Sequence, residues 1–163
     1  MSNAAPLPNP AVEPETPADA QAVEALVLAA FGPGRFAKTA ERLREKAGVE
    51  AGFVVRDQGR IIGSVRLWRI KVGDTPALFL GPIAVDAASR RAGLGADLVA
   101  ACVDHAKAAG TGGVLLVGDA PYFSRFGFQA APDVRLPGPA DQRRVLWLPV
   151  AVEPPAGMTR PVV

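Results

Sequence analysis

The sequence predicts an α/β fold in which a mixed, mostly antiparallel central sheet carries helices on both faces. Segments rich in β-branched residues at 52–57, 60–72 and 78–85 follow one another with tight turns between them, which predicts an antiparallel meander. A helical segment at 93–109 and a short apolar strand at 114–117 come next. Because a strand–helix–strand unit returns the chain in the same direction, we expect strands 78–85 and 114–117 to be parallel.

The chain length of 163 residues is that of a single domain, which we place at residues 16–150. Residues 1–15 carry four prolines and little apolar surface, so we expect a disordered N-terminal tail. Residues 151–163 carry three further prolines, and we expect an irregular C-terminal tail.

The remaining elements follow from helical and strand periodicity. Two helices are expected before the meander, the first capped by Thr16 and the second at about 36–47. After the parallel pair, the sequence predicts a short helix at 122–126, a proline-rich loop at 132–142 and a last strand at 143–150. The apolar residues of that last strand alternate between two faces, with Val145 and Trp147 on one and Leu146 and Leu148 on the other.

Composition argues against several classes of function. Eighteen basic and 16 acidic side chains give a net charge of only +2, and no basic stretch is interleaved with aromatic residues, so we expect no nucleic-acid partner. No signal-peptide pattern and no run of 18 apolar residues is present, so we expect no membrane association and a cytoplasmic location. We expect Cys102, the single cysteine, to be a buried packing residue, and His105, the single histidine, to be structural. One histidine and one cysteine do not make a metal site.

The strand at 78–85 contains a Gly81–Pro82 step that interrupts its pairing. Proline has no amide hydrogen to donate to a sheet, so we expect a bulge at this point. A bulge would turn the rest of the strand away from its parallel neighbour and leave a cleft lined by free peptide groups of residues 83–85. Such a cleft suits an elongated ligand with a peptide-like arm. An irregular edge that binds nothing fits the pattern equally well.

The loop before the third helical segment has the composition of an anion site. Gly93 and Gly95 leave backbone N–H groups exposed at the positive end of the helix dipole, and Arg90 and Arg91 add full charges. We therefore expect a phosphate here. A dinucleotide-binding loop is discounted, because its third glycine would fall at Leu98 and because a seven-residue loop separates the glycines from the strand.

Two segments around these features resemble the GNAT superfamily of N-acetyltransferases. The sequence LGPIAVD at 80–86, followed by RRAGLG at 90–95, resembles the family's acyl-CoA-binding motif, Arg/Gln-x-x-Gly-x-Gly/Ala after an apolar strand. Downstream, VGDAPYFSRFGF at 117–128 resembles a subgroup often labelled predicted acetyltransferases. The two motifs lie apart in the chain and agree, and the element order over 16–150 matches as well.

The resemblance implies a GNAT-like sheet with a splayed parallel strand pair, and transfer of an acetyl (acyl) group from acetyl-CoA to a primary amine. The amine of a small-molecule or peptide acceptor would attack the thioester directly within a ternary complex, without a covalent enzyme intermediate or a metal. A backbone N–H near Ile83 would polarise the thioester carbonyl. A homodimer is among the expected assemblies. The residues implied to bind the pantetheine arm and the pyrophosphate are Ile83, Ala84, Val85, Arg90, Arg91, Ala92, Gly93, Leu94, Gly95 and Ala96.

The sequence departs from the family pattern at the proton donor for the leaving thiolate. The usual tyrosine lies four residues before the glycine of the Gly-Phe pair, and Phe123 occupies that position. Tyr122 and Ser124 are alternative donors, and Asp119 is the candidate base. For Tyr122 a packing or substrate-lining role is favoured, and for Asp119 a helix-capping role. Transfer without an acid stays open, because a CoA thiol is a fair leaving group. The alternative function is a catalytically impaired acyl-CoA-binding sensor or interaction domain.

Overall fold

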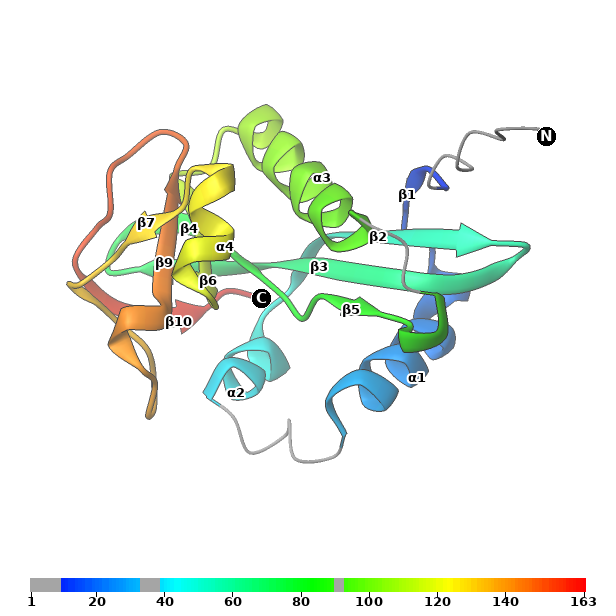
Figure 1. Cartoon of the computed structure of the whole chain (residues 1–163). Helices are drawn as coiled ribbons and strands as arrows, with labels where there is room; N and C mark the ends of the chain where they lie inside the picture. The colour runs from blue at the N-terminus through cyan, green and yellow to red at the C-terminus, as the bar shows by residue number, and fades with distance from the viewer. Residues whose placement is uncertain (1–9, 33–38, 90–92) are drawn as a thin grey trace.

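The computed structural model describes residues 10–32, 39–89 and 93–163. Its central sheet separates two helical layers, as Figure 1 shows. Helices α1 (Ala20–Phe31) and α2 (Thr39–Lys46) cover one face, and α3 (Leu94–Ala109) and the short α4 (Ala120–Phe123) lie on the other. The prediction of helices on both faces is confirmed.

The main sheet runs in the order β1-β2-β3-β4-β6-β9-β7. All neighbours in this order are antiparallel except β4 and β6, which are parallel. The predicted meander and the predicted parallel pair are therefore confirmed. The strand bounds are Val49–Asp57 for β2, Arg60–Val72 for β3, Thr75–Leu80 for β4, Gly113–Val117 for β6, Gln129–Ala130 for β7 and Val145–Pro149 for β9.

The 13-residue strand β3 is long enough to take two partners along each edge. On one edge, β4 pairs with its second half and β5 (Ala84–Val85) with its first half. On the other edge, β2 is followed by β10 (Gly157–Pro161). The prediction of an irregular tail at 151–163 is therefore wrong for residues 157–161, which form β10. This strand pairs with peptide groups of β3 that lie beyond the end of β2. Strand β10 also pairs in parallel with β8 (Val134–Arg135), inside the segment expected to be a loop.

The chain is ordered further towards its N-terminus than the proline content suggested. Strand β1 (Val12–Pro14) pairs with β2, so the disordered tail expected at 1–15 is wrong for these residues, while residues 1–9 lie outside the described part. Ion pairs fix this segment to the sheet: Glu15 lies 2.8 Å from Arg66, and Asp19 lies 2.7 Å from Arg56. The Arg56 guanidinium holds the pKa of Asp19 well below its usual range.

The first helix begins as its capping pattern predicted. The backbone amide and the hydroxyl of Thr16 donate to Oδ2 of Asp19 at 2.8 and 3.0 Å, and a 3₁₀ turn, η1 (Pro17–Asp19), leads into α1. The predicted second helix at 36–47 corresponds to α2, and its first three residues lie outside the described part. Further 3₁₀ turns are η3 (Ala87–Ser89), η4 (Ser124–Phe126) and η5 (Gln142–Arg144). No helix in the described ranges is long and apolar enough to cross a bilayer.

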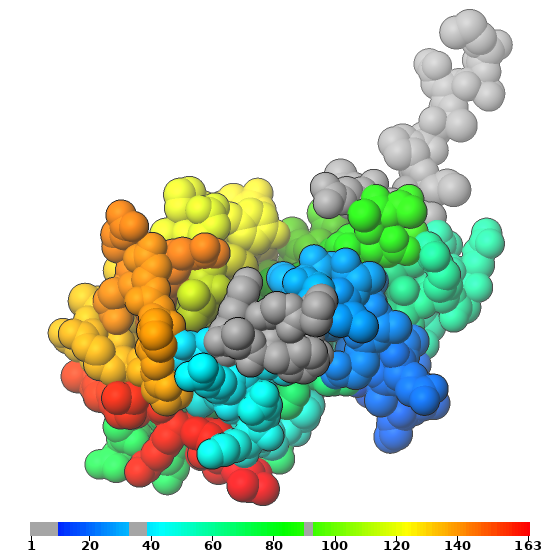
Figure 2. Space-filling view, turned by 90° about the horizontal axis from the view of Figure 1, so that it is seen from below, coloured from blue at the N-terminus to red at the C-terminus, as the bar shows by residue number. Residues whose placement is uncertain are grey.

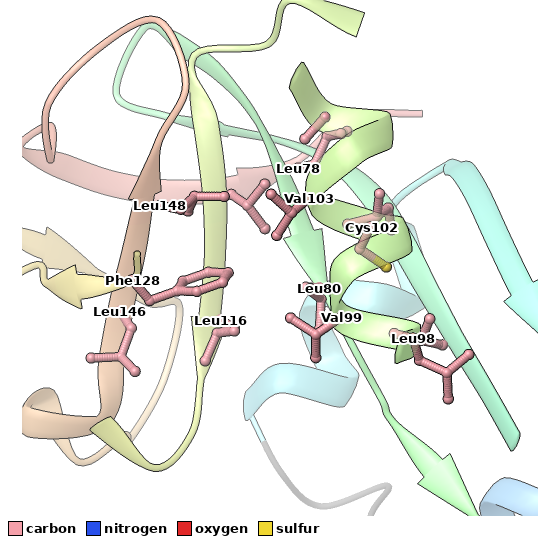
Figure 3. Packing of buried hydrophobic residues seen from close by; sticks show 14 of the residues in the cluster. Leu78, Leu80, Leu98, Val99, Cys102, Val103, Leu116, Phe128, Leu146 and Leu148 are labelled. Carbon is pink, nitrogen blue, oxygen red and sulfur yellow. The ribbon is translucent and has the colours of Figure 1, made fainter. Parts of the chain in front are cut away.

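The core on the α3 face holds the single cysteine. Figure 3 shows side chains of α3 packed over those of β4, with side chains of β6 and β9 beside them. Cys102 is fully buried there, and burial raises the pKa of its thiol to about 12, so the thiol stays neutral at physiological pH. This confirms a packing role. The labelled residues are Leu78, Leu80, Leu98, Val99, Cys102, Val103, Leu116, Phe128, Leu146 and Leu148.

The opposite face buries a second set of apolar side chains under α1 and α2. Leu43 of α2 packs with Phe79 and Trp147, while Val23 and Val27 of α1 pack with residues of β2 and β3. The predicted alternation along the last strand is confirmed, since Val145 and Trp147 face α2 and Leu146 and Leu148 face α3.

Candidate functional site

The Gly81–Pro82 step produces the predicted bulge. Leu80 lies opposite Leu67 of β3, whereas Ala84 lies opposite Ser64. Three residues, 81–83, therefore face two residues of β3, and the register shifts by one. The backbone groups of Gly81 are still satisfied: its amide donates to the carbonyl of Arg66 at 2.9 Å, and its carbonyl accepts from the indole of Trp68 at 2.6 Å.

The parallel strands diverge at the same level. Strand β4 pairs with β6 only through Leu78 and Phe79, which lie opposite Val114 and Leu115. Beyond this point β6 continues to Val117 but pairs only with β9, and the chain on the other side turns through the bulge into β5. Figure 1 shows β5 running away from β6. The predicted splay is confirmed.

The strand after the bulge presents peptide groups to both sides. Residues in an antiparallel pair alternate between those that exchange hydrogen bonds and those that do not. The amide of Asp86 donates to the carbonyl of Ile62 at 2.8 Å, so Ala84 also turns its peptide groups towards β3. The N–H and C=O of Val85 then point to the open side. The amide of Ile83 has no hydrogen-bond partner among the described residues.

The N-terminus of α3 lies beside this open strand. Gly93 precedes the helix with φ of +85°, a left-handed conformation that favours glycine. The first backbone bond of the helix joins the amide of Asp97 to the carbonyl of Gly93, which leaves the amides of Leu94, Gly95 and Ala96 without an intrahelical acceptor. Three of the predicted contacts, Arg90, Arg91 and Ala92, lie outside the described residues.

These backbone groups share one cleft, which we call the edge cleft, of about 570 Å³. The structure thus brings together the described predicted contacts from the strand and from the helix. Its lining residues are Ala30, Ile83, Ala84, Val85, Gly93, Leu94, Gly95, Ala96, Tyr122 and Arg125.

Among the described residues, Tyr122 and Arg125 supply the polar side chains of the edge cleft. A Cβ added to Gly95 would lie 3.6 Å from the Tyr122 hydroxyl, which places that hydroxyl at the start of α3. The Arg125 guanidinium lies 4.5 Å from the centre of the Tyr122 ring, and its Nε donates to the Tyr122 carbonyl at 3.3 Å. Sequence reasoning missed Arg125. Its spacing of three residues from Tyr122, on one side of a helical turn, was the available signal.

A second cavity, which we call the splay cavity, occupies about 740 Å³ between the diverging strands. Residues 80–83 line it from one side of the splay and residues 116–119 from the other. Further walls come from α2 and from residues 136–144. Ile83 lines both cavities, so the two meet at the bulge.

The three predicted catalytic residues lie in different places. Asp119 lines the splay cavity, and its Oδ2 accepts from the amide of Tyr122 at 3.2 Å, so the predicted cap is present. Tyr122 faces the edge cleft, whereas its neighbour Phe123 faces the splay cavity. Ser124 is exposed, donates to the carbonyl of Pro121 at 3.0 Å and lines neither cavity.

His105 lies away from both cavities. Its Nε2 is 3.2 Å from Oε2 of Glu50, and its ring meets that of Phe53 edge-on at 6.1 Å. These contacts agree with the structural role predicted for it.

Comparison with known proteins identifies the family. The model of the acetyltransferase (GNAT) family matches residues 20–128. The uncharacterized N-acetyltransferase YhbS of Escherichia coli K12 is 34% identical over 120 residues, which cover 72% of each chain.

Solved structures agree with this match. The crystal structure of E. coli YhbS in complex with CoA superposes with a TM-score of 0.82 at 27% identity, covering 99% of this chain and 94% of that one. A GNAT family acetyltransferase from Brucella melitensis, solved with acetyl-CoA, shares the fold with a TM-score of 0.72 at 24% identity, covering 91% and 93%. The chain therefore belongs to the GNAT family of acetyltransferases.

Proposed function

We propose that this protein transfers an acetyl group from acetyl-CoA to the primary amine of an acceptor by direct attack within a ternary complex. The edge cleft takes the acetyl-CoA, and the splay cavity takes the acceptor. The observation that carries this proposal is the one-residue register shift at 81–83. It frees the outer peptide edge of Val85, parts β4 from β6, and lies beside the exposed amides of α3.

The residues of the edge cleft fit acetyl-CoA. A pantetheine arm contains two amide groups, which match the outward N–H and C=O of Val85 and its neighbours Ile83 and Ala84. A pyrophosphate matches the exposed amides of Gly93, Leu94, Gly95 and Ala96. A side chain longer than that of alanine at position 95 would project into this space. Arg125 lends positive charge, as would the predicted contacts Arg90 and Arg91, while the predicted contact Ala92 would offer only its backbone amide. Both YhbS and the Brucella protein were solved with CoA or acetyl-CoA, which supports the assignment.

The chain's own groups supply the needs of the reaction at the junction of the two cavities. Acetyl-CoA brings the thioester when bound. The free amide of Ile83 is placed to donate to the thioester carbonyl and stabilise the charge that develops there. Tyr122, the hydroxyl of the edge cleft, is our candidate to protonate the leaving thiolate. Asp119, in the splay cavity, is our candidate to accept the proton of the amine. We leave Ser124 out, because it lines neither cavity.

An acyl-CoA-binding sensor is the competing function, because Phe123 stands at the usual position of the acid. The two are separated by incubating the protein with acetyl-CoA carrying ¹³C in the acetyl group and a mixture of amines. We expect free CoA thiol and an amide product that contains the label. Tight CoA binding without labelled amide would favour the sensor. Label attached to the protein itself through an ester or a thioester would contradict direct attack.

A further inference from the structure

The charges around the splay cavity indicate what kind of amine it accepts. Five charged side chains line it among the described residues: Arg42, Arg44, Asp119, Asp141 and Arg144. Three of these are already engaged. The guanidinium of Arg44 lies 3.1 Å from Glu41, Asp141 accepts two bonds from the Arg143 side chain, and Asp119 caps α4.

The other two are arginines that form no ion pair within the described chain, although Asp141 attracts Arg144 from beyond ion-pair distance. Arg42 of α2 has no carboxylate within ion-pair distance among the described residues, and neither has Arg144, whose Nε reaches only the carbonyl of Gly118 at 3.4 Å. Both are exposed. Their elements adjoin, because the Thr39 hydroxyl donates to the carbonyl of Pro139 at 2.6 Å. Figure 2 shows α2 beside the segment around residue 140.

Apart from Thr39, the other described side chains of the lining are apolar. Phe31, Phe79, Leu80, Leu116, Phe123 and Leu136 contribute hydrocarbon surface. A site with largely apolar walls and two guanidinium groups outside ion pairs suits a ligand with an apolar body and an anionic oxygen group, since guanidinium binds carboxylate or phosphate through two parallel hydrogen bonds. The same charges repel a polycation.

We propose that the acceptor is an amine that also carries a carboxylate or phosphate, held by Arg42 and Arg144, while its amino group points towards the bulge at Ile83. This rests on the transfer reaction proposed above. It assigns Arg42 and Arg144 to acceptor selection and leaves cofactor binding to the edge cleft.

The test compares amines that share a body and differ in the anionic group, with release of CoA thiol from acetyl-CoA as the measurement. Phenylalanine is paired with 2-phenylethylamine for the carboxylate, phosphoethanolamine with ethanolamine for the phosphate, and spermidine serves as the polycation. We expect kcat/KM at least about tenfold higher for the anionic member of one pair, the pair itself identifying the group. Equal or faster turnover of the members that lack the anionic group, or spermidine as the best substrate, would overturn the proposal.

Substitutions of the two arginines test whether they cause the preference for amines with an anionic group. R42Q and R144Q should each lower kcat/KM for the preferred member of the pair, which carries the anionic group, by about 10- to 100-fold and leave kcat/KM for the member without that group unchanged. R160Q is the matched control, because Arg160 is an exposed arginine on β10 that lines neither cavity. An equal loss in R160Q, or no loss in either cavity variant, would contradict the assignment. Failure of every amine despite CoA binding would refute the transfer reaction, whereas turnover only of amines without an anionic group would refute only the acceptor class.

Discussion

The two cavities that meet at Ile83 are built from different parts of the chain. The edge cleft is formed mainly by backbone groups of two short segments, 83–85 and 93–96. The splay cavity is formed mainly by side chains from four distant parts of the chain: α2, the end of β4 with the bulge, the end of β6, and residues 136–144. A backbone site depends on the local path of the chain and tolerates most side chains. A side-chain site can change its ligand by substitution without changing the fold.

Among the side chains of the two cavities, Tyr122 of the edge cleft should give the largest effect on kcat. Y122F should lower kcat by about 10- to 100-fold, near the lower end for general acids because CoA thiolate leaves readily, with the Kd for CoA unchanged. The measurement is steady-state kinetics together with calorimetric CoA binding.

The double variant Y122F/F123Y gives the control for position. If the acid acts from position 122, moving the hydroxyl to position 123 does not restore activity, since Phe123 faces the splay cavity. Full recovery in the double variant would assign the acid to position 123. A change in the Kd for CoA without a change in kcat would show that Tyr122 contributes to CoA binding and not to proton transfer.

A smaller effect, on the Kd for CoA, should distinguish the contribution of the Val85 backbone amide from that of the Val85 side chain in the edge cleft. V85P removes an N–H that points away from β3 and should weaken CoA binding by about 2- to 10-fold, the value of one neutral hydrogen bond. V85I keeps the N–H and should bind CoA normally. Thermal unfolding checks that both variants stay folded, and equal affinities would mean that the peptide edge does not contact the cofactor.

The smallest effect should come from a substitution at Gly138 and should change only the KM for the acceptor. A Cβ at Gly138 would lie 2.7 Å from the Thr39 hydroxyl, so G138V should displace the wall formed by Thr39 and Pro139. We expect the acceptor KM to rise by about 2- to 5-fold, with CoA affinity unchanged. T39V removes the hydrogen bond without the clash and shows which of the two matters. A change in CoA affinity would show that the two cavities are not independent.

The difference between a site built from local backbone groups and one built from distant side chains also explains which parts of the two cavities the sequence could predict. The bulge follows from Pro82, which cannot donate to the sheet, and the anion site follows from Gly93 and Gly95 at a helix start, so local chemistry sufficed for both. Tyr122 was uncertain because its direction depends on how the short α4 continues into η4.

Long-range pairing accounts for what was missed in the fold. Strands β1 and β10 are short, contain proline, and exist because β2 and β3 offer free edges far away in sequence. The splay of the strands was predicted from Pro82, but the side chains that wall the splay cavity from α2 and residues 136–144 could not be, for the same reason. Arg42 and Arg144 stand about a hundred positions apart, and only the folded chain shows that they face one cavity.

The central claim, that the cleft between β5 and α3 binds acetyl-CoA, is tested most directly at Gly95. Gly93 is unsuitable because its positive φ would strain any other residue, whereas Gly95 lies in the helix. A Cβ at Gly95 makes only ordinary contact, 3.6 Å from the Tyr122 hydroxyl, so G95A should keep CoA affinity. G95E puts a carboxylate where we place the phosphates and should weaken CoA binding about 100-fold or more, while the helix dipole favours the acidic residue and preserves the fold. A folded G95E variant that binds CoA normally would contradict the account.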